Sequence, residues 1–82
     1  LMSTSQKLSR LYQAVAERLA KAIAAGDYKP GDRLPAERDL AEQFDVSRTT
    51  IREAIIALEI QGVVEVRIGS GVYVTSAQPK GK

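Results

Sequence analysis

The 82-residue sequence contains no cysteine, no histidine and no tryptophan. Their absence excludes disulfides, thiol nucleophiles and Cys/His zinc sites, and it removes the usual general base near neutral pH. No apolar run approaches the roughly 20 residues that a membrane helix requires, and no signal-peptide pattern opens the chain. We therefore expect a cytoplasmic protein without enzymatic activity, and we expect this domain to hold no metal or other cofactor.

The charges are nearly balanced, with 12 lysines and arginines against 10 acidic residues and a net charge of +2. This excess is too small to indicate a nucleic-acid partner by itself, so the positions of the basic residues must decide the question. The length predicts one small domain, and a hydrophobic fraction of 44% is too high for a disordered chain. Aromatic residues make up only 5% of the sequence, which argues against the stacking platform of a single-strand binder.

Apolar residues at helical spacing predict a first helix over residues 11–25, with Ser9 as its N-cap and Gly26 at its end. After a Pro-Gly turn, a second helix is expected over residues 36–44, with Pro35 tolerated in its first turn. The side chains expected to be buried in these two helices are Leu11, Val15, Ala16, Leu19, Ala20, Ile23, Leu40, Ala41 and Phe44.

A tight break at residues 45–46 separates the second helix from a third, which Ser47 caps and which runs to about Gln61, just before Gly62. Its predicted buried stripe is Ile51, Ala54, Ile55 and Leu58. Two helices joined by about three residues match a helix-turn-helix.

Residues 63–67 are rich in β-branched side chains, residues 68–71 contain two glycines that favour a turn, and residues 72–75 return as a second strand. A hairpin directly after a helix-turn-helix makes it the winged form. The predicted fold class is thus α+β, a winged helix-turn-helix over residues 10–75.

Polar segments flank this domain. Residues 1–9 are expected to be a flexible lead-in, and residues 76–82 a polar tail that links to a further domain.

The third predicted helix opens with Ser47, Arg48, Thr49 and Thr50, and Arg52 follows one turn after Arg48. Two arginines in the first turns oppose the helix dipole, so acidic residues would be the stabilising choice there. The arrangement becomes favourable when an external anion meets the free N–H groups and the guanidinium groups. DNA phosphates and guanine edges are such groups, and a helix fits the major groove.

Further contacts to the DNA backbone are expected outside that helix. Arg38 would reach a phosphate as its own helix crosses the strand. At the hairpin tip, Arg67 supplies charge, and Gly69, with Ser70 beside it, lets the backbone approach a phosphate closely. Tyr12, at the start of the first predicted helix, would reach a phosphate through its hydroxyl or its backbone N–H.

These residues also admit an interpretation without DNA. In it the arginines form surface ion pairs, namely Arg48 with Asp45, Arg52 with Glu59 and Arg38 with Asp39 or Glu42. The hairpin would be an ordinary turn, and Tyr12 a half-buried core residue. Because the arginines follow a helix-turn-helix pattern, we favour the DNA interpretation for them.

Over about residues 11–75 the chain resembles the DNA-binding domain of the GntR family of bacterial transcription regulators. Four segments carry the resemblance, which are Tyr28 to Arg38, Val46 to Ala54, Leu58 to Gly62 and Gly69 to Val74. Within the family, Pro35 to Arg38 and Ser47 to Ala54 resemble the FadR subfamily. The pair Leu58-Glu59 and the four residues Val64 to Arg67 resemble its hexuronate-regulator members.

The resemblance implies DNA contacts by three arginines, assisted by hydroxyl side chains, and these residues are Arg38, Arg48, Arg52, Ser47, Thr49 and Thr50. It also implies that the wing at Gly69 enters the minor groove. Ile68 departs from the family, whose members often carry a polar or basic residue such as histidine there, so Arg67 and the Gly69 backbone must carry the wing contacts. The family further implies a C-terminal domain, not included in this sequence, that binds a small metabolite, often holds a metal, and dimerises.

We therefore predict a metabolite-responsive repressor that binds a palindromic operator in double-stranded DNA, with one domain per half-site and a homodimeric full-length protein. The isolated domain is expected to be monomeric in free solution, because its apolar stripes are all used in one core. The alternative is a winged-helix module that binds an acidic protein partner. The lack of aromatic anchors on the third predicted helix speaks against it.

Overall fold

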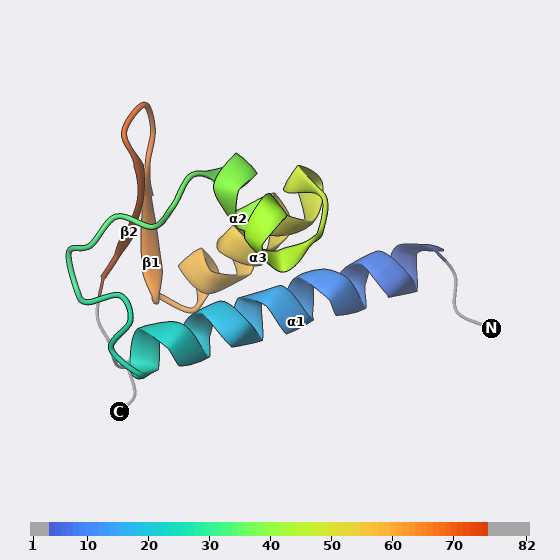
Figure 1. Cartoon of the computed structure of the whole chain (residues 1–82), viewed down its shortest axis with the longest axis horizontal. Helices are drawn as coiled ribbons and strands as arrows, with labels where there is room; N and C mark the ends of the chain where they lie inside the picture. The colour runs from blue at the N-terminus through green and yellow to red at the C-terminus, as the bar shows by residue number, and fades with distance from the viewer. Residues whose placement is uncertain (1–3, 76–82) are drawn as a thin grey trace.

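A long helix lies beneath a pair of shorter helices, and a two-stranded hairpin stands beside them (Figure 1). The computed structural model describes the backbone of residues 4–75 and the side chains of residues 10–75, so residues 1–3 and the predicted tail 76–82 lie outside the described part. In chain order the elements are α1 (Thr4–Ala24), α2 (Glu37–Phe44), α3 (Arg48–Ile60), β1 (Val64–Arg67) and β2 (Gly71–Val74). The antiparallel pairing of β1 with β2 completes the predicted α+β winged helix-turn-helix. None of the helices within residues 4–75 is long and apolar enough to cross a bilayer.

The first helix begins earlier than the sequence predicted. Ser9, expected to cap it, lies inside α1, which starts at Thr4. Residues 4–9 are therefore helical where a flexible lead-in was expected. No glycine or proline interrupts the sequence before Gly26, and residues 6–8 are good helix formers, so a helix fixed by core packing propagates back through Ser9.

The core lies where α1 packs along α3, and α2 and the hairpin close it. The buried apolar residues are Val15, Ala16, Leu19, Ile23, Leu34, Leu40, Ala41, Ile51, Ala54, Ile55, Leu58, Val64 and Val74. The predicted stripe of α3 is confirmed in full. Leu11 differs from prediction and is 45% exposed, because α1 extends past the α2–α3 pair at its N-terminal end (Figure 1). Phe44 is only partly buried, with the Arg18 guanidinium 4.8 Å from its ring centre.

A left-handed residue makes the turn between α2 and α3. Asp45 has φ 58°, and the N–H of Val46 donates to the carbonyl of Ala41 at 3.0 Å, which closes the end of α2. At the other end of α2, Pro35 precedes the N-cap residue instead of lying in the first turn, because Ala36 is extended (ψ 157°) and the helix begins only after it.

The hairpin is held on both edges of β2. On one edge β1 and β2 pair from Val64 opposite Val74 to Arg67 opposite Gly71. On the other edge Arg33 bridges to Tyr73, flanked by bonds from the Leu34 N–H to the Val72 carbonyl at 2.8 Å and from the Val74 N–H to the Asp32 carbonyl at 2.9 Å. The segment between α1 and α2 thus acts as a third strand that fixes the hairpin to the helices.

Candidate nucleic-acid interface

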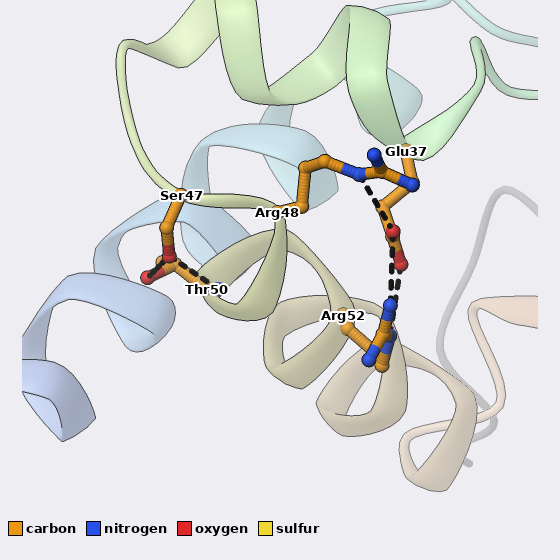
Figure 2. A network of polar contacts seen from close by, with 5 residues as sticks. All are labelled: Glu37, Ser47, Arg48, Thr50 and Arg52. Atoms are coloured by element: carbon orange, nitrogen blue, oxygen red, sulfur yellow. Dashed lines mark hydrogen bonds and ion pairs between the residues drawn. The ribbon is translucent and has the colours of Figure 1, made fainter.

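The N-terminus of α3 is capped as predicted. The Ser47 hydroxyl accepts a hydrogen bond from the Thr50 N–H at 3.1 Å and lies 3.0 Å from the Thr50 hydroxyl (Figure 2). Thr50 itself is only 4% exposed. The residue three positions after the cap faces the core in this helix, and the Thr50 hydroxyl is bonded to that of Ser47. The assistance of Thr50 in DNA contact stays a prediction.

Arg48 and Arg52 extend from one face of α3 and converge on a single carboxylate, that of Glu37 at the start of α2 (Figure 2). The Arg48 Nε lies 3.3 Å from Glu37 Oε1. Arg52 makes two bonds, from Nε to Oε2 at 3.0 Å and from Nη2 to Oε1 at 3.1 Å. One acidic side chain thus serves two arginines, and Arg52 forms the bidentate pair.

These contacts shift the pKa values of Glu37 and Arg52. The hydrogen bond from Arg52, more than that from Arg48, holds the pKa of the Glu37 carboxyl below its ordinary value, against a smaller opposing effect of burial. The same bond to Glu37 raises the pKa of Arg52. Glu37 is therefore a carboxylate, and Arg52 is charged, at neutral pH.

The arginines remain accessible in spite of these bonds. The side chain of Arg48 is 62% exposed and that of Arg52 61%, whereas Glu37 is 28% exposed. The carboxylate supplies, from another helix, the negative charge that the first turn of α3 lacks. Arg48 and Arg52 thus form one exposed, oriented cationic surface.

This use of Glu37 was not predicted from the sequence. The ion pairs offered as alternatives, with Asp45 and Glu59, do not form within residues 10–75, where both arginines pair with Glu37. Glu37 is 11 residues from Arg48 and 15 from Arg52, so no helical spacing connects them. Only the crossing of α2 over α3 brings them together.

The other predicted residues of the two helices lie at the surface. Ser47 and Thr49 are exposed beside Arg48. Arg38 is exposed in the first turn of α2, and within residues 10–75 it forms no ion pair, neither with Asp39 nor with Glu42.

Tyr12 lies in the setting that the interpretation without DNA gave it. It is half-buried and packs against the core. Because α1 starts at Thr4, the N–H of Tyr12 lies in the middle of the helix and is occupied by its own backbone bond. The predicted phosphate contact through a free backbone N–H is therefore wrong, and the contact through the hydroxyl stays a prediction.

The wing tip is organised by Tyr73. The Arg67 guanidinium lies 4.4 Å from the centre of the Tyr73 ring, and its Nη2 is 3.4 Å from Glu65 Oε1. The hydroxyls of Ser70 and Tyr73 are 2.6 Å apart. The hairpin register contained the signal, since Glu65 stands opposite Tyr73 and places Arg67 on the diagonal.

A second basic residue at the wing, Arg33, was also missed. Its side chain lies against Gly71, where an added Cβ would be 2.5 Å from Arg33 Nε. Gly71 also has φ 145°, which favours glycine. Arg33 and Arg67 therefore place two cations on the hairpin, while Gly69, at φ 80°, turns the chain at its tip.

Comparisons with known proteins agree with this architecture. Residues 11–74 match the family described as bacterial regulatory proteins, gntR family. The Exu regulon transcriptional regulator of Escherichia coli (strain K12) is 56% identical over 71 residues, which are 87% of this chain and 28% of that protein. The Uxu operon transcriptional regulator of the same strain is 49% identical over 73 residues, 89% of this chain and 28% of that protein. The solved structure of AraR(DBD) in complex with operator ORR3 has a TM-score of 0.76 at 38% identity, over 79% of this chain and 78% of that one.

The two regulators share this domain with the chain and continue well beyond it. The chain spans about 28% of their length. The family match covers all three helices from residue 11 onward and the hairpin, which are the elements that build the interface described above. The chain belongs to the GntR family of bacterial regulatory proteins, as its DNA-binding domain with a winged helix-turn-helix fold.

Proposed function

We propose that this domain belongs to a metabolite-responsive bacterial repressor of the FadR subfamily and binds a palindromic operator in double-stranded DNA, one domain per half-site. The observation that supports this proposal is the exposed face of α3, from which Arg48 and Arg52 both extend to bond Glu37. A solved relative with this fold is AraR(DBD) in complex with operator ORR3.

The bonds to Glu37 leave the arginines able to read bases. A guanidinium group has five N–H donors, and Arg48 uses only Nε, which leaves both terminal nitrogens for the O6 and N7 of a guanine. Arg52 uses Nε and one N–H of Nη2, so its opposite edge, made by Nη1 and Nη2, remains able to form a bidentate contact. Fixing both groups before binding lowers the entropy lost when they meet DNA.

The remaining predicted residues would fix the register of the domain on the duplex. Arg38 at the start of α2 and Arg67, Gly69 and Ser70 at the wing lie on the surface, where contacts to phosphates position a domain without reading sequence. Arg33 joins this group because its side chain lies beside the wing. Thr49 would complete base recognition next to Arg48.

The relatives are much longer than this chain, which supports separate domains for separate functions in the full-length protein. In this proposal residues 10–75 bind DNA, residues 76–82 begin a linker, and further sequence supplies a domain that dimerises and binds a metabolite, with or without a metal. The isolated domain would be a monomer in free solution, and pairing on the operator would depend on that further domain.

Selection from a random-sequence duplex pool tests this function. The affinity of the winning duplex is then compared with that of a scrambled duplex across a salt series. We expect a palindrome bound at least about a thousandfold more tightly than the scramble, with a steep salt dependence. If binding is weak and independent of sequence, the selection is repeated with the domain fused to a dimerisation domain. Binding that is still independent of sequence in the fused protein would refute operator recognition.

A matched pair of variants connects the result to α3. Arg48→Ala should reduce the preference for the selected duplex by about 1–3 kcal/mol. Lys21→Ala removes the same charge from the last turn of α1, at the opposite end of the molecule from the start of α3, and should preserve the preference (Figure 1). Absence of binding even at low salt would instead support the protein-interaction module.

A further inference from the structure

A pocket of about 330 Å³ lies where α2, α3 and the hairpin meet, a volume within the range of small-molecule sites in proteins. Side chains from all three elements line it. Leu40 of α2 and Ile51 of α3 are buried, whereas Ile56 of α3 and Val66 of β1 remain 43% and 39% exposed. Two large aliphatic side chains that solvent still reaches therefore converge on one concave surface.

The apolar part of this lining favours an aliphatic ligand. Within residues 10–75 every apolar residue of the lining is aliphatic, proline included, so these residues offer no aromatic ring on which a flat ligand could stack. The half-buried Val72 of β2 extends the same surface. A compact saturated body would remove the exposed parts of Ile56 and Val66 from water, which the domain itself leaves uncovered.

The charged part of the lining is unbalanced. It holds two carboxylates, of Glu37 and Glu59, and one guanidinium, of Arg52, so its net charge is −1 in a chain whose net charge is +2. Arg52 is already engaged by Glu37 through bonds of 3.0 and 3.1 Å (Figure 2). Glu59 is exposed and forms no ion pair within residues 10–75. The free charge at the pocket is thus one carboxylate, which attracts a cation and repels an anion.

We propose that this pocket binds a small aliphatic amine, whose ammonium group pairs with Glu59 and whose hydrocarbon body packs on Ile56 and Val66. A primary ammonium is compact and carries three donors, so it can bond the Glu59 carboxylate and keep water at its remaining positions. The proposal goes beyond operator recognition and does not depend on it. Because Glu37 and Arg52 also line the pocket, an occupant lies beside the arginines of the candidate interface.

Three small molecules of nearly equal shape test the charge and the body of the ligand separately. They are cyclohexylmethylamine, the neutral cyclohexylmethanol and the anionic cyclohexanecarboxylate, each titrated into the isotope-labelled 82-residue chain and followed by amide chemical shifts. We expect the amine to shift the amides of Ile56, Val66 and Val72 with a dissociation constant in the millimolar range, as is usual for so small a ligand. It should bind about two- to fivefold more tightly than the alcohol, the gain typical of one solvated ion pair, and the carboxylate should bind most weakly.

Two pairs of variants assign the result to the pocket. Glu59→Gln should bind the amine and the alcohol equally, whereas Glu53→Gln, which removes the same charge from an exposed position of α3 outside the lining, should keep the preference. Val66→Phe fills the pocket and should abolish the shifts caused by all three molecules. Ile60→Phe enlarges a side chain that is 80% exposed and lies outside the lining, and it should bind as the wild type does. Thermal unfolding checks that each variant is folded, and the two glutamine variants change only surface side chains, so they decide the matter even if Val66→Phe unfolds.

Every other result overturns the proposal. If none of the three molecules shifts amides around the pocket at the highest concentration it reaches in water, the pocket holds only solvent. Equal binding of the amine and the alcohol would exclude the ion pair with Glu59, and tightest binding of the carboxylate would assign the charge of the pocket to Arg52. Loss of the preference in Glu53→Gln as well as in Glu59→Gln would reduce the effect to the general charge of α3.

Discussion

Glu37 and Arg52, which belong to different helices of the helix-turn-helix, form a bidentate ion pair with bonds of 3.0 and 3.1 Å. The pair leaves the outer edge of the guanidinium, made by Nη1 and Nη2, free. Its carboxylate also accepts a bond from Arg48, so a single residue of α2 sets the direction of both arginines of α3.

Replacing Glu37 by glutamine should reduce specificity while strengthening sequence-blind binding. Without the carboxylate, Arg48 and Arg52 move freely and must be ordered on DNA, at a cost of about 0.5–1.5 kcal/mol for each side chain. We expect the ratio of operator to scrambled affinity to fall about tenfold. Affinity for scrambled DNA should rise, because a negative charge has left the interface. Binding titrations on both duplexes measure the two effects.

Asp39→Asn is the control for the change in charge, since Asp39 lies in the same first turn of α2 but forms no ion pair within residues 10–75. This variant should preserve the wild-type ratio. An equal fall in both variants would mean that charge alone, and not orientation by Glu37, determines specificity.

The contribution of Glu37 to stability should depend on pH. Because Arg52 and Arg48 hold its pKa below the ordinary 4.5 in the folded protein, the carboxylate stabilises the fold fully above that value. This stabilisation should disappear as the pH falls through the lowered pKa. Urea unfolding of the wild type and of Glu37→Gln between about pH 7 and pH 3 measures it, as a difference in midpoint that is constant at first and then shrinks. A difference that stays constant down to the lowest pH would contradict the assigned shift.

Ser47 should have separable roles in stability and in binding. Ser47→Ala removes the acceptor for the Thr50 N–H and should lower the free energy of unfolding by about 1 kcal/mol. Ser47→Asp keeps a cap acceptor and should preserve stability, but its negative charge beside the DNA should weaken binding. Thr49→Ala, at an exposed position without a capping bond, should change stability little. Thermal unfolding and DNA titration of the three variants give both readouts, and an Asp variant that binds normally would place Ser47 away from DNA.

Replacing Arg52 and replacing Arg67 should affect DNA binding in different ways. Arg52→Ala should cost about 1–3 kcal/mol of binding and relax the preference at one base pair. Arg67→Ala should weaken binding to all duplexes and lower the salt slope by about one unit. Affinities measured across a salt series, with single-base variants of the operator, distinguish the two.

Because Arg67 also stacks on Tyr73, Arg67→Lys is needed to separate its charge from its packing. The Arg67→Lys variant should retain the salt slope of the wild type and lose part of the stacking on Tyr73 that supports the wing tip. A slope that is unchanged in Arg67→Ala would refute the phosphate contact.

Much of the fold could be predicted because its signals are local. The cap at Ser47, the left-handed Gly62 after α3 and the stripe from Ile51 to Leu58 each depend on residues within one helix. Thr50 belonged to the same local pattern, since it follows the cap by three residues and precedes Ile51. The burial of Thr50 could therefore have been predicted from helical periodicity. It was missed because the polar residues at the start of α3 were all assigned to the surface.

The rest depended on contacts between elements. Glu37 reaches two arginines only because α2 crosses α3, and no spacing in the sequence shows this crossing. The start of α1 at Thr4 depends on propagation from a packed core, because no local stop signal was present. That extension removed the free N–H on which the backbone contact of Tyr12 depended. The position of Arg33 beside Gly71 likewise requires the third strand.

The attachment of β2 to the segment before α2 has a consequence for how an operator can be spaced. Since Arg33 bridges to Tyr73 and the same segment leads directly into α2, the hairpin and the helix pair form a single rigid body. The distance between the bases contacted by α3 and those contacted by the wing is then fixed within each half-site. Insertion of one base pair inside a half-site should therefore weaken binding strongly. Operators that differ in length should differ in the number of base pairs between the half-sites.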